Sequence, residues 1–178
     1  MNKYHKLLKK VLDKGKHQQN NKGSITYLLN ETLNLKPADL LEIFEGHGIA
    51  RNKLKTELQL FQQGERLTER YREAGINWWD YCGPILVNSY PTYFEKLPGL
   101  IQFQIDRDKL VVSAYQRSSD ANLGLPADIY HLYLISRQIE LPLKSITLYI
   151  GNAHIYQNNI EKTKQLLEGQ SVKFELNV

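Results

Sequence analysis

The sequence predicts an α+β fold, in which helices pack on a mixed or mostly antiparallel sheet. Helical periodicity prevails up to Gly75, and short runs of β-branched and aromatic residues prevail after it. The helices and strands do not alternate regularly, as they would in a parallel α/β fold. A length of 178 residues, 42% of them hydrophobic, suits one domain with its own core, so we expect a single domain over residues 1–178.

Helices are expected first. Apolar side chains near the start fall on one stripe of an amphipathic helix ending near Gly15: Tyr4, Leu7, Leu8, Val11 and Leu12. Residues Gln18 to Gly23 are predicted to form a polar connection. Two further helices are expected, from about Asn52 to Gln63, where Gly64 can end the helix, and from about Leu67 to Ala74.

The predicted strands begin after Gly75. Three short runs have strand composition: Ile85 to Val87, Leu100 to Ile105, and Leu110 to Tyr115. The charged turn at residues 106–108 separates the last two runs, so these two runs predict a hairpin.

The last part of the chain mixes both element types. Pro126 can occupy the first turn of a long helix that ends before Pro142. Strands are expected over Ser145 to Ile150 and Val172 to Leu176, with a helix over about Ile160 to Leu167 between them.

Composition narrows the class of protein. The net charge is +4, but many of the basic residues lie in the first 22 positions, where a solvated helix face explains them, so nucleic-acid binding is only weakly supported. Cys82 is the single cysteine, which excludes an internal disulfide and a Cys-rich zinc site, and we expect no metal. No run approaches the roughly 18 apolar residues of a membrane span, so we expect a soluble cytoplasmic protein.

Several polar side chains suit an anionic or hydroxylated ligand. Arg117 offers a planar fork of donors for a phosphate or carboxylate, and Ser118 adds a hydroxyl. Asp120 and Asp128 are acceptors near the start of the helix that Pro126 opens. The alternative is structural: Arg117 and Asp120 as a surface ion pair, and Asp128 as a helix-start residue.

His154 and Tyr156 add a second pair of candidate ligand contacts. They lie two residues apart on an expected strand or its continuation, so they would point to the same face and share a ligand. The alternative is that His154 is a satisfied, half-buried histidine.

Two long motifs carry a resemblance to a known family. The run from Tyr115 to Ile129, YQRSSDANLGLPADI, resembles the YQRSxDxxLGLPxNI segment of thymidylate synthases and pyrimidine hydroxymethylases. The run from Gly151 to Asn158 resembles their GDxHxYxN segment. Weaker similarity covers the ELxxFxxG helix at Glu57 to Gly64, the Trp79-Asp80 pair and the first helix. The resemblance implies a thymidylate synthase-like fold.

The resemblance also implies roles for individual residues. Arg117 and Ser118 match residues that hold the nucleotide phosphate, and His154 and Tyr156 match residues that bind the sugar hydroxyl. Gln116 is assigned to substrate binding with them. Asp120 matches a residue at the contact of folate and nucleotide.

Three further positions bear on the base and the cofactor. Asp128 replaces the asparagine that reads the pyrimidine edge, an exchange characteristic of members acting on cytosine nucleotides such as dCMP hydroxymethylase; we therefore favour cytosine over uracil. Glu57 matches a proton-handling catalytic residue. Trp79 matches a residue packing on folate, with helix core as its alternative, so methylenetetrahydrofolate is the cofactor expected of an active enzyme.

The sequence departs from the family where catalysis begins. The family's nucleophilic cysteine would fall within Glu95 to Leu100, which holds no cysteine, and the chain is expected to carry internal deletions around residues 83–99. Cys82 could replace it or could be a packing residue; nothing basic adjoins it in sequence.

The phosphate site and the C-terminus depart as well. Asn21 occupies the position at which the family has a phosphate-binding arginine after its first helix, and Lys22 beside it is a weak substitute. The family's arginine pair that reaches across from the partner subunit would fall at about Gly83-Pro84. The closing C-terminal tail is also expected to be absent.

Three functions remain open from the sequence. The favoured one is a protein, acting as a homodimer or beside an active relative, that binds a pyrimidine nucleotide or nucleoside without the cysteine-dependent reaction. The second is a folate-dependent pyrimidine C5 methyl- or hydroxymethyltransferase with a replacement nucleophile. The third is a structural or nucleic-acid-contacting protein with a vestigial pocket.

Overall fold

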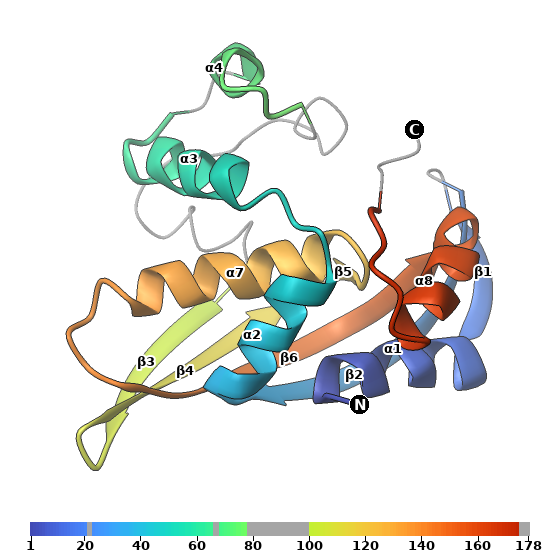
Figure 1. Cartoon of the computed structure of the whole chain (residues 1–178), viewed down its shortest axis with the longest axis horizontal. Coiled ribbons are helices and arrows are strands. Elements are labelled where there is room, and N and C mark those ends of the chain that lie inside the picture. Colours follow the sequence, from blue (N-terminus) through green and yellow to red (C-terminus); the bar gives the residue numbers. More distant parts are fainter. Residues whose placement is uncertain (21–22, 66–67, 78–99, 175–178) are drawn as a thin grey trace.

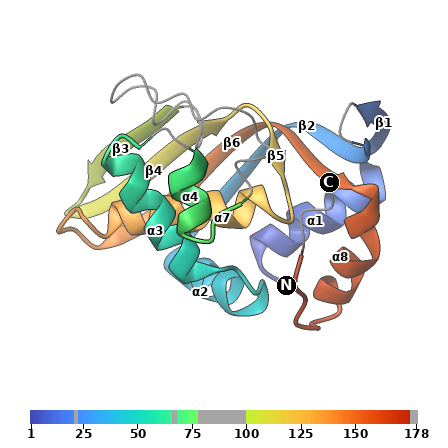
Figure 2. The same cartoon turned by 90° about the horizontal axis from the view of Figure 1, so that it is seen from above.

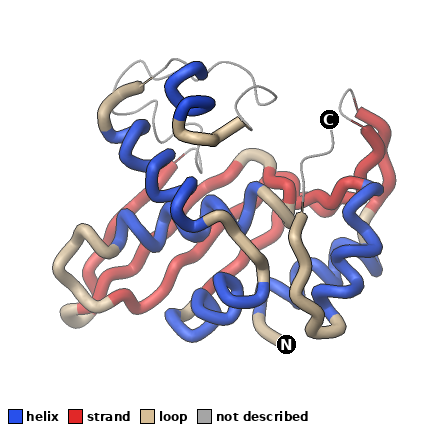
Figure 3. The backbone as a smooth tube through the Cα atoms, turned by 45° about the horizontal axis from the view of Figure 1, so that its top comes forward, coloured by secondary structure: helices blue, strands red, loops and turns tan. Residues whose placement is uncertain are grey.

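A mixed sheet of six strands is the framework of the molecule (Figure 1). The computed structural model describes residues 1–20, 23–65, 68–77 and 100–174. Within these, the main strand order is β1-β2-β6-β4-β3, and β5 pairs with β6 off this path. The strands are β1 (Lys16–Asn20), β2 (Gly23–Leu35), β3 (Leu100–Asp106), β4 (Lys109–Gln116), β5 (Ser119–Asp120) and β6 (Leu143–Tyr156). Figure 3 shows them as one continuous layer.

The pairing pattern makes the sheet mixed. Strands β4 and β5 run parallel to β6, whereas the pairs β1–β2, β2–β6 and β3–β4 are antiparallel. The described helices are α1 (Lys3–Lys14), α2 (Pro37–Gly46), α3 (Arg51–Gln62), α4 (Thr68–Glu73), α7 (Gly124–Ser136) and α8 (Ile160–Leu167), with a short 3₁₀ turn at Gln157–Asn159. In Figure 2, α1, α2, α7 and α8 lie on one side of the sheet. The predicted α+β class is confirmed. None of the helices in the described parts of the chain is long and apolar enough to cross a membrane.

Helix α1 follows directly from its sequence pattern. Asn2 caps it, since its side-chain oxygen accepts from the His5 N–H at 2.8 Å. The predicted stripe is buried at Tyr4, Leu7, Leu8 and Val11 and packs against β2. Each such apolar side chain contributes roughly 1.5–3 kcal/mol when fully buried, so α1 is held by tertiary packing more than by its own propensity.

The predicted hairpin and three of the predicted helices are confirmed. Strands β3 and β4 pair antiparallel across residues 106–109. Helices α3, α4 and α8 cover the expected stretches to within about two residues, the usual uncertainty at helix ends. Helix α7 begins at Gly124, so Pro126 lies in its first turn as expected, but the helix already ends at Ser136.

Two predictions were wrong within the described residues. Residues 16–20, most of which were assigned to a polar connection, form β1, which pairs with β2 from Lys16↔Tyr27 to Asn20↔Gly23. The C-terminal strand expected from Val172 is not formed over residues 171–174. Val172 and Phe174 are instead buried in the core at 8% and 7% exposure, so their apolar composition led to burial without strand pairing. The expected strand at Ile85 to Val87 lies outside the described residues.

Strand β2 and helix α2 went unpredicted. A recognisable start signal precedes α2: Pro37 occupies its first turn, and the Asp39 carboxylate accepts from the Lys36 N–H at 2.8 Å. In β2, Asn30 adopts a left-handed conformation with φ of 57°. Its buried residues are the adjacent pair Ile25 and Thr26 near its start and the alternating pair Leu33 and Leu35 at its end, so the strand as a whole lacks the expected alternation.

Strand β6 changes its buried face at the same level of the sheet. Ile146, Leu148 and Ile150 are buried before the change, and Ala153 and Ile155 after it. At Gly151, a Cβ atom would lie 2.7 Å from the Arg117 carbonyl oxygen, so only glycine fits without a shift of that backbone. The change of face therefore falls where β6 passes the end of β4.

Candidate functional site

The motif from Gln116 to Asp120 lies where β4 ends and β5 begins. Gln116 is buried beneath α7, Arg117 is exposed, and Ser118 and Asp120 are half-buried. Strand β5 pairs with β6 so that the Cα of Asp120 lies opposite that of His154. The two sequence motifs, more than 20 residues apart along the chain, thus meet through sheet pairing.

Ser118, His154 and Tyr156 form one group. The Ser118 hydroxyl lies 3.5 Å from His154 Nδ1, at the limit of a hydrogen bond. The rings of His154 and Tyr156 contact edge to face, with centroids 5.3 Å apart. Their two-residue spacing on β6 therefore brings both side chains to one face, as the sequence predicted. The group offers a hydroxyl, an imidazole and a phenol to a common ligand.

Asp120 is held by the backbone that follows it. Its Oδ1 accepts from the Asn122 N–H at 2.9 Å, and the Tyr4 hydroxyl of α1 donates to the Ala121 carbonyl at 2.8 Å. Burial raises the pKa of Asp120 to about 6, against the lowering effect of the backbone N–H groups of Asn122 and Leu123. Of the ion pairs between described residues, none joins Arg117 to Asp120, so that structural alternative is wrong.

Asp128 is a buried acid bonded to a buried amide. It is the fifth residue of α7 and is 9% exposed, so it lies beyond the first turn and is not a helix-start residue. Gln116 Nε2 donates to Asp128 Oδ2, while Gln116 Oε1 has no partner among the described residues. Burial raises the pKa of Asp128 to about 8; the Gln116 bond lowers it, and the charge of Glu57 raises it. At neutral pH this carboxyl therefore carries a proton.

Glu57 belongs to a second buried pair, one that the sequence did not predict. His131 Nε2 on α7 lies 3.4 Å from Glu57 Oε2 on α3 and 3.0 Å from the Leu54 carbonyl oxygen. Glu57 is 2% exposed and His131 is 1% exposed. Burial lowers the pKa of His131 to about 4, so its ring is neutral at neutral pH. The sequence offered one signal for His131: it follows Asp128 by three residues, and residues i and i+3 share a helix face.

The two groups are neighbours along the chain. Gln116 and Ser118 are two residues apart, on either side of the bend at Arg117 where β4 ends. Whether Arg117, Asp128, His154 and Tyr156 surround a single cavity stays a prediction. Within the described residues, no cluster of three or more His, Cys, Asp or Glu side chains could hold a metal ion.

Several predicted residues lie outside the described residues. They are the folate-contact candidate Trp79, Cys82, the Glu95 to Gly99 segment of the expected nucleophile loop, and the phosphate-site positions Asn21 and Lys22. The predicted loss of the nucleophile and the role of Cys82 therefore stay predictions.

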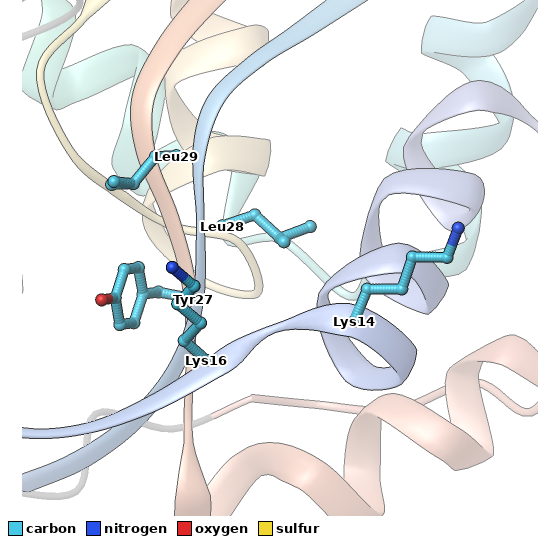
Figure 4. A pocket seen from close by; sticks show the side chains of 5 residues that line it. All are labelled: Lys14, Lys16, Tyr27, Leu28 and Leu29. Carbon is cyan, nitrogen blue, oxygen red and sulfur yellow. The ribbon is translucent and has the colours of Figure 1, made fainter.

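A pocket of about 210 Å³ lies beside β2, lined by Lys14, Lys16, Tyr27, Leu28 and Leu29 (Figure 4). In Figure 4 the side chains of Tyr27 and Leu28 project from opposite sides of the strand. This volume is below the roughly 300–1,000 Å³ of typical small-molecule sites, and only Tyr27, the Cα partner of His154, connects it to the predicted site. We therefore assign no ligand to it.

Fold and site together define an α+β protein with a buried acid–amide pair between α7 and β4 and a serine–histidine–tyrosine group at β5 and β6. The family model described as thymidylate synthase matches residues 96–177, which include both motifs. Over this segment, somewhat less than half of its length, the chain is similar to the thymidylate synthase family.

Known thymidylate synthases match the chain over part of their length. The thymidylate synthase of Mycoplasma genitalium is 38% identical over 90 residues, which cover 45% of this chain and 31% of the relative. That of Mycoplasma pneumoniae is 40% identical over 75 residues, covering 40% and 26%. That of Listeria innocua is 40% identical over 72 residues, covering 38% and 23%. The matched part of the chain thus spans less than a third of each of these relatives.

Proposed function

We propose that the chain binds a cytosine-bearing nucleotide or nucleoside, with Asp128 and Gln116 contacting the base and Ser118, His154 and Tyr156 contacting the sugar and phosphate side. Arg117 and Asp120 complete this proposed substrate site. The observation that carries the proposal is the buried Asp128 carboxyl, which is bonded to Gln116 and protonated at neutral pH.

Cytosine suits such a carboxyl for a chemical reason. Its N3 is an acceptor and its N4 amino group a donor, so a neutral carboxyl donates through O–H to N3 and accepts from N4–H through the other oxygen. The proton can move from the carboxyl to N3 while both hydrogen bonds persist. Uracil presents O4 in place of the amino group, and O4 is a much weaker base than N3 of cytosine. The pair therefore favours cytosine.

We propose further that this binding is not followed by the cysteine-dependent reaction of the family. Glu95 to Leu100 contains no cysteine, serine, threonine or histidine to add to C6 of the pyrimidine. Methylenetetrahydrofolate is proposed as a ligand only for the alternative of an active transferase, with Trp79 and Asp120 as its contacts and Glu57 as the proton-handling residue. Turnover of this folate with dCMP or dUMP would support that alternative against ours.

Ligand titrations test the proposed specificity. Cytidine and dCMP are expected to raise the melting temperature more than uridine and dUMP do, and the affinity for cytidine should fall about tenfold per pH unit once Asp128 loses its proton above pH about 8. Asp128→Asn should reverse the order of bases and remove this fall, because an amide has no proton to lose in this range.

The matched control is Asn34→Asp, which adds a carboxylate on β2 next to Thr147 and outside the proposed site. It should leave the preference for cytosine unchanged. Equal, negligible shifts with all four compounds would contradict the proposal.

We also propose that two copies of the chain pair through the face of the sheet that the described helices leave open. Tyr115 and Tyr149 are partners on β4 and β6 and are 48% and 50% exposed, whereas Ala114 and Leu148 beside them are buried under the helices. Analytical ultracentrifugation is expected to give twice the 20.7 kDa chain mass, and Tyr149→Lys should shift the chain to monomer because it places two charges in the interface. A monomer for the unaltered chain at micromolar concentration would rule out this assembly.

A further inference from the structure

The turn between β5 and α7 is hydrogen-bonded to three other elements. Asp120 ends β5, and residues 121–123 form the turn that leads into α7. The Ala121 N–H donates to the His154 carbonyl at 2.7 Å, and the Ala121 carbonyl accepts from the Tyr4 hydroxyl at 2.8 Å. Ala121 and Tyr4 are fully buried, so water does not compete for the bond between them. The backbone directly after Asp120 is thus held by β6 and by α1.

The third contact of the turn is a buried amide–hydroxyl pair. Asn122 Nδ2 lies 3.0 Å from Thr163 Oγ1 on α8, and both side chains are fully buried. The Thr163 hydroxyl has a single proton, and the Asn159 carbonyl oxygen, at 2.7 Å, is nearer to it than Asn122 Oδ1, at 3.2 Å. The hydroxyl therefore donates to Asn159 and accepts from the Asn122 amide. Helices α1 and α8, which pack against each other (Figure 2), both hold the turn.

The same turn binds the Asp120 carboxyl. Asp120 Oδ1 accepts from the Asn122 N–H at 2.9 Å, so the residue that orients the carboxyl is the one whose side chain is bonded to Thr163. No side chain among the described residues donates to this carboxyl, and a carboxylate has room for further donors. The Cα of Asp120 lies opposite that of His154, so the carboxyl belongs to the strand beside the Ser118–His154–Tyr156 group.

We propose that Tyr4, Asn122 and Thr163 are positioning residues, which hold the Asp120 carboxyl where it accepts a hydrogen bond from a donor group of the ligand. This inference rests on the proposed function for the identity of the ligand. A carboxylate in a loose turn would have to be ordered when the ligand binds, and that ordering would weaken binding. Because α1 and α8 already hold the turn, the acceptor is in place before the ligand arrives. Loss of one of these contacts is therefore expected to reduce affinity through Asp120.

Cytidine titrations at pH 7.5 test the effect on binding. Thr163→Val replaces the hydroxyl with a methyl group and is expected to lower the affinity for cytidine about tenfold, whereas Thr163→Ser keeps the hydroxyl and should retain the affinity. In an Asp120→Asn background, Thr163→Val should cause no further loss. The matched control is Thr147→Val, because Thr147 Oγ1 also accepts from an asparagine amide, Asn34 Nδ2 at 2.7 Å, but outside the proposed site. This control should leave the affinity unchanged.

A measurement without ligand tests the positioning separately. In NMR spectra of the free protein, the Asn122 amide proton should change its shift with a midpoint near pH 6, because its acceptor, the Asp120 carboxyl, gains a proton there. Two other titratable residues adjoin the turn, Tyr4 of α1 and His154 of β6, so Asp120→Asn must abolish the transition if it belongs to Asp120. Thr163→Val is expected to reduce the size of the transition at least twofold, and Thr163→Ser should preserve it.

The outcomes separate the positioning role from a structural one. An equal loss of affinity in Thr147→Val or Thr163→Ser, or a loss that persists beside Asp120→Asn, overturns the proposal, since a purely structural contribution would act without Asp120. An unchanged Asn122 transition in Thr163→Val overturns it as well. If Thr163→Val does not fold, Tyr4→Phe, which removes the bond to the Ala121 carbonyl, decides the point by the same two measurements.

The two measurements also distinguish this inference from the proposed function. If the Asn122 transition responds to Thr163→Val as expected but the unaltered chain does not bind cytidine, the proposed function is wrong and the positioning of Asp120 stands. If cytidine binds but Thr163→Val leaves both its affinity and the Asn122 transition unchanged, the proposed function stands and the positioning role is wrong.

Discussion

Replacing Asp128 with asparagine is expected to raise the free energy of unfolding at pH 8 by roughly 4–6 kcal/mol, while changing it little at pH 4. Asp128 has an ordinary pKa of 3.8 and a folded-state pKa of about 8, because it is buried near Glu57. An acid whose pKa is raised by folding binds a proton more tightly in the folded state. Its contribution to stability is therefore present below pH 3.8 and is lost as the pH rises to about 8.

The pH dependence is what distinguishes this effect from a change in packing. The difference between Asp128→Asn and the unaltered chain should grow by about 1.4 kcal/mol per pH unit between pH about 4 and about 8. An amide retains the hydrogen bond from Gln116 and never ionises. Urea unfolding at a series of pH values measures the difference.

Asp13→Asn is the matched control for this series. Asp13 is an exposed α1 carboxylate that lies 3.0 Å from Lys9. A surface pair of this kind contributes about 0–1 kcal/mol, so the control should show little dependence on pH. A difference for Asp128→Asn that is the same at pH 5 and pH 8.5 would show that the folded Asp128 titrates like an exposed carboxyl.

The predictable part of the fold is the part with an unbroken local period. The stripe of α1 and the hairpin of β3 and β4 each repeat one pattern over their whole length, and both were predicted within a few residues. In β2 the left-handed Asn30 interrupts the alternation, so its 13 residues have no consistent period of two. Helix α2 is short and carries only Leu40, Ile43 and Phe44 as buried side chains, too few for a periodic signal without attention to its Pro37 start.

The residues of the candidate site also separate into those that a local sequence pattern predicts and one that only the tertiary structure reveals. Arg117, Ser118, His154 and Tyr156 were predicted because they stand in long motifs, and sheet pairing between β5 and β6 brings those motifs together. His131 was missed because its partner Glu57 is 74 positions away along the chain and the contact depends on how α3 packs against α7. A histidine on a helix carries no local sequence signal of a buried contact with another helix. The sequence predicted donors and acceptors one by one, but only the tertiary structure shows which of them are in contact.

Acidic pH is expected to destabilise the fold through a different residue, His47, at the end of α2. This ring is 4% exposed, stacks on Phe174 with centroids 4.9 Å apart and meets the Tyr4 ring edge to face at 5.6 Å. Its Nε2 has no partner among the described residues. Burial, with a smaller contribution from the nearby His5, lowers the pKa of His47 to about 4 against the raising effect of a backbone hydrogen bond. The ring joins α1, α2 and the segment before the C-terminus in its neutral form.

His47→Phe is therefore expected to raise the free energy of unfolding by about 3 kcal/mol at pH 4 relative to the unaltered chain, and to change it by less than about 1.5 kcal/mol at pH 7.5. A histidine whose pKa is lowered by folding contributes stability that is present above its ordinary pKa of 6.5 and is lost as the pH falls to about 4. Phenylalanine keeps the stacked ring and has nothing to protonate, so the gain must develop between these two values. His17→Gln, at an exposed histidine of β1, is the control and should follow the unaltered chain. If His47→Phe and the unaltered chain lose stability in parallel between pH 6.5 and 4, water or an anion reaches the His47 ring in the folded protein, and the stack with Phe174 does not exclude charge.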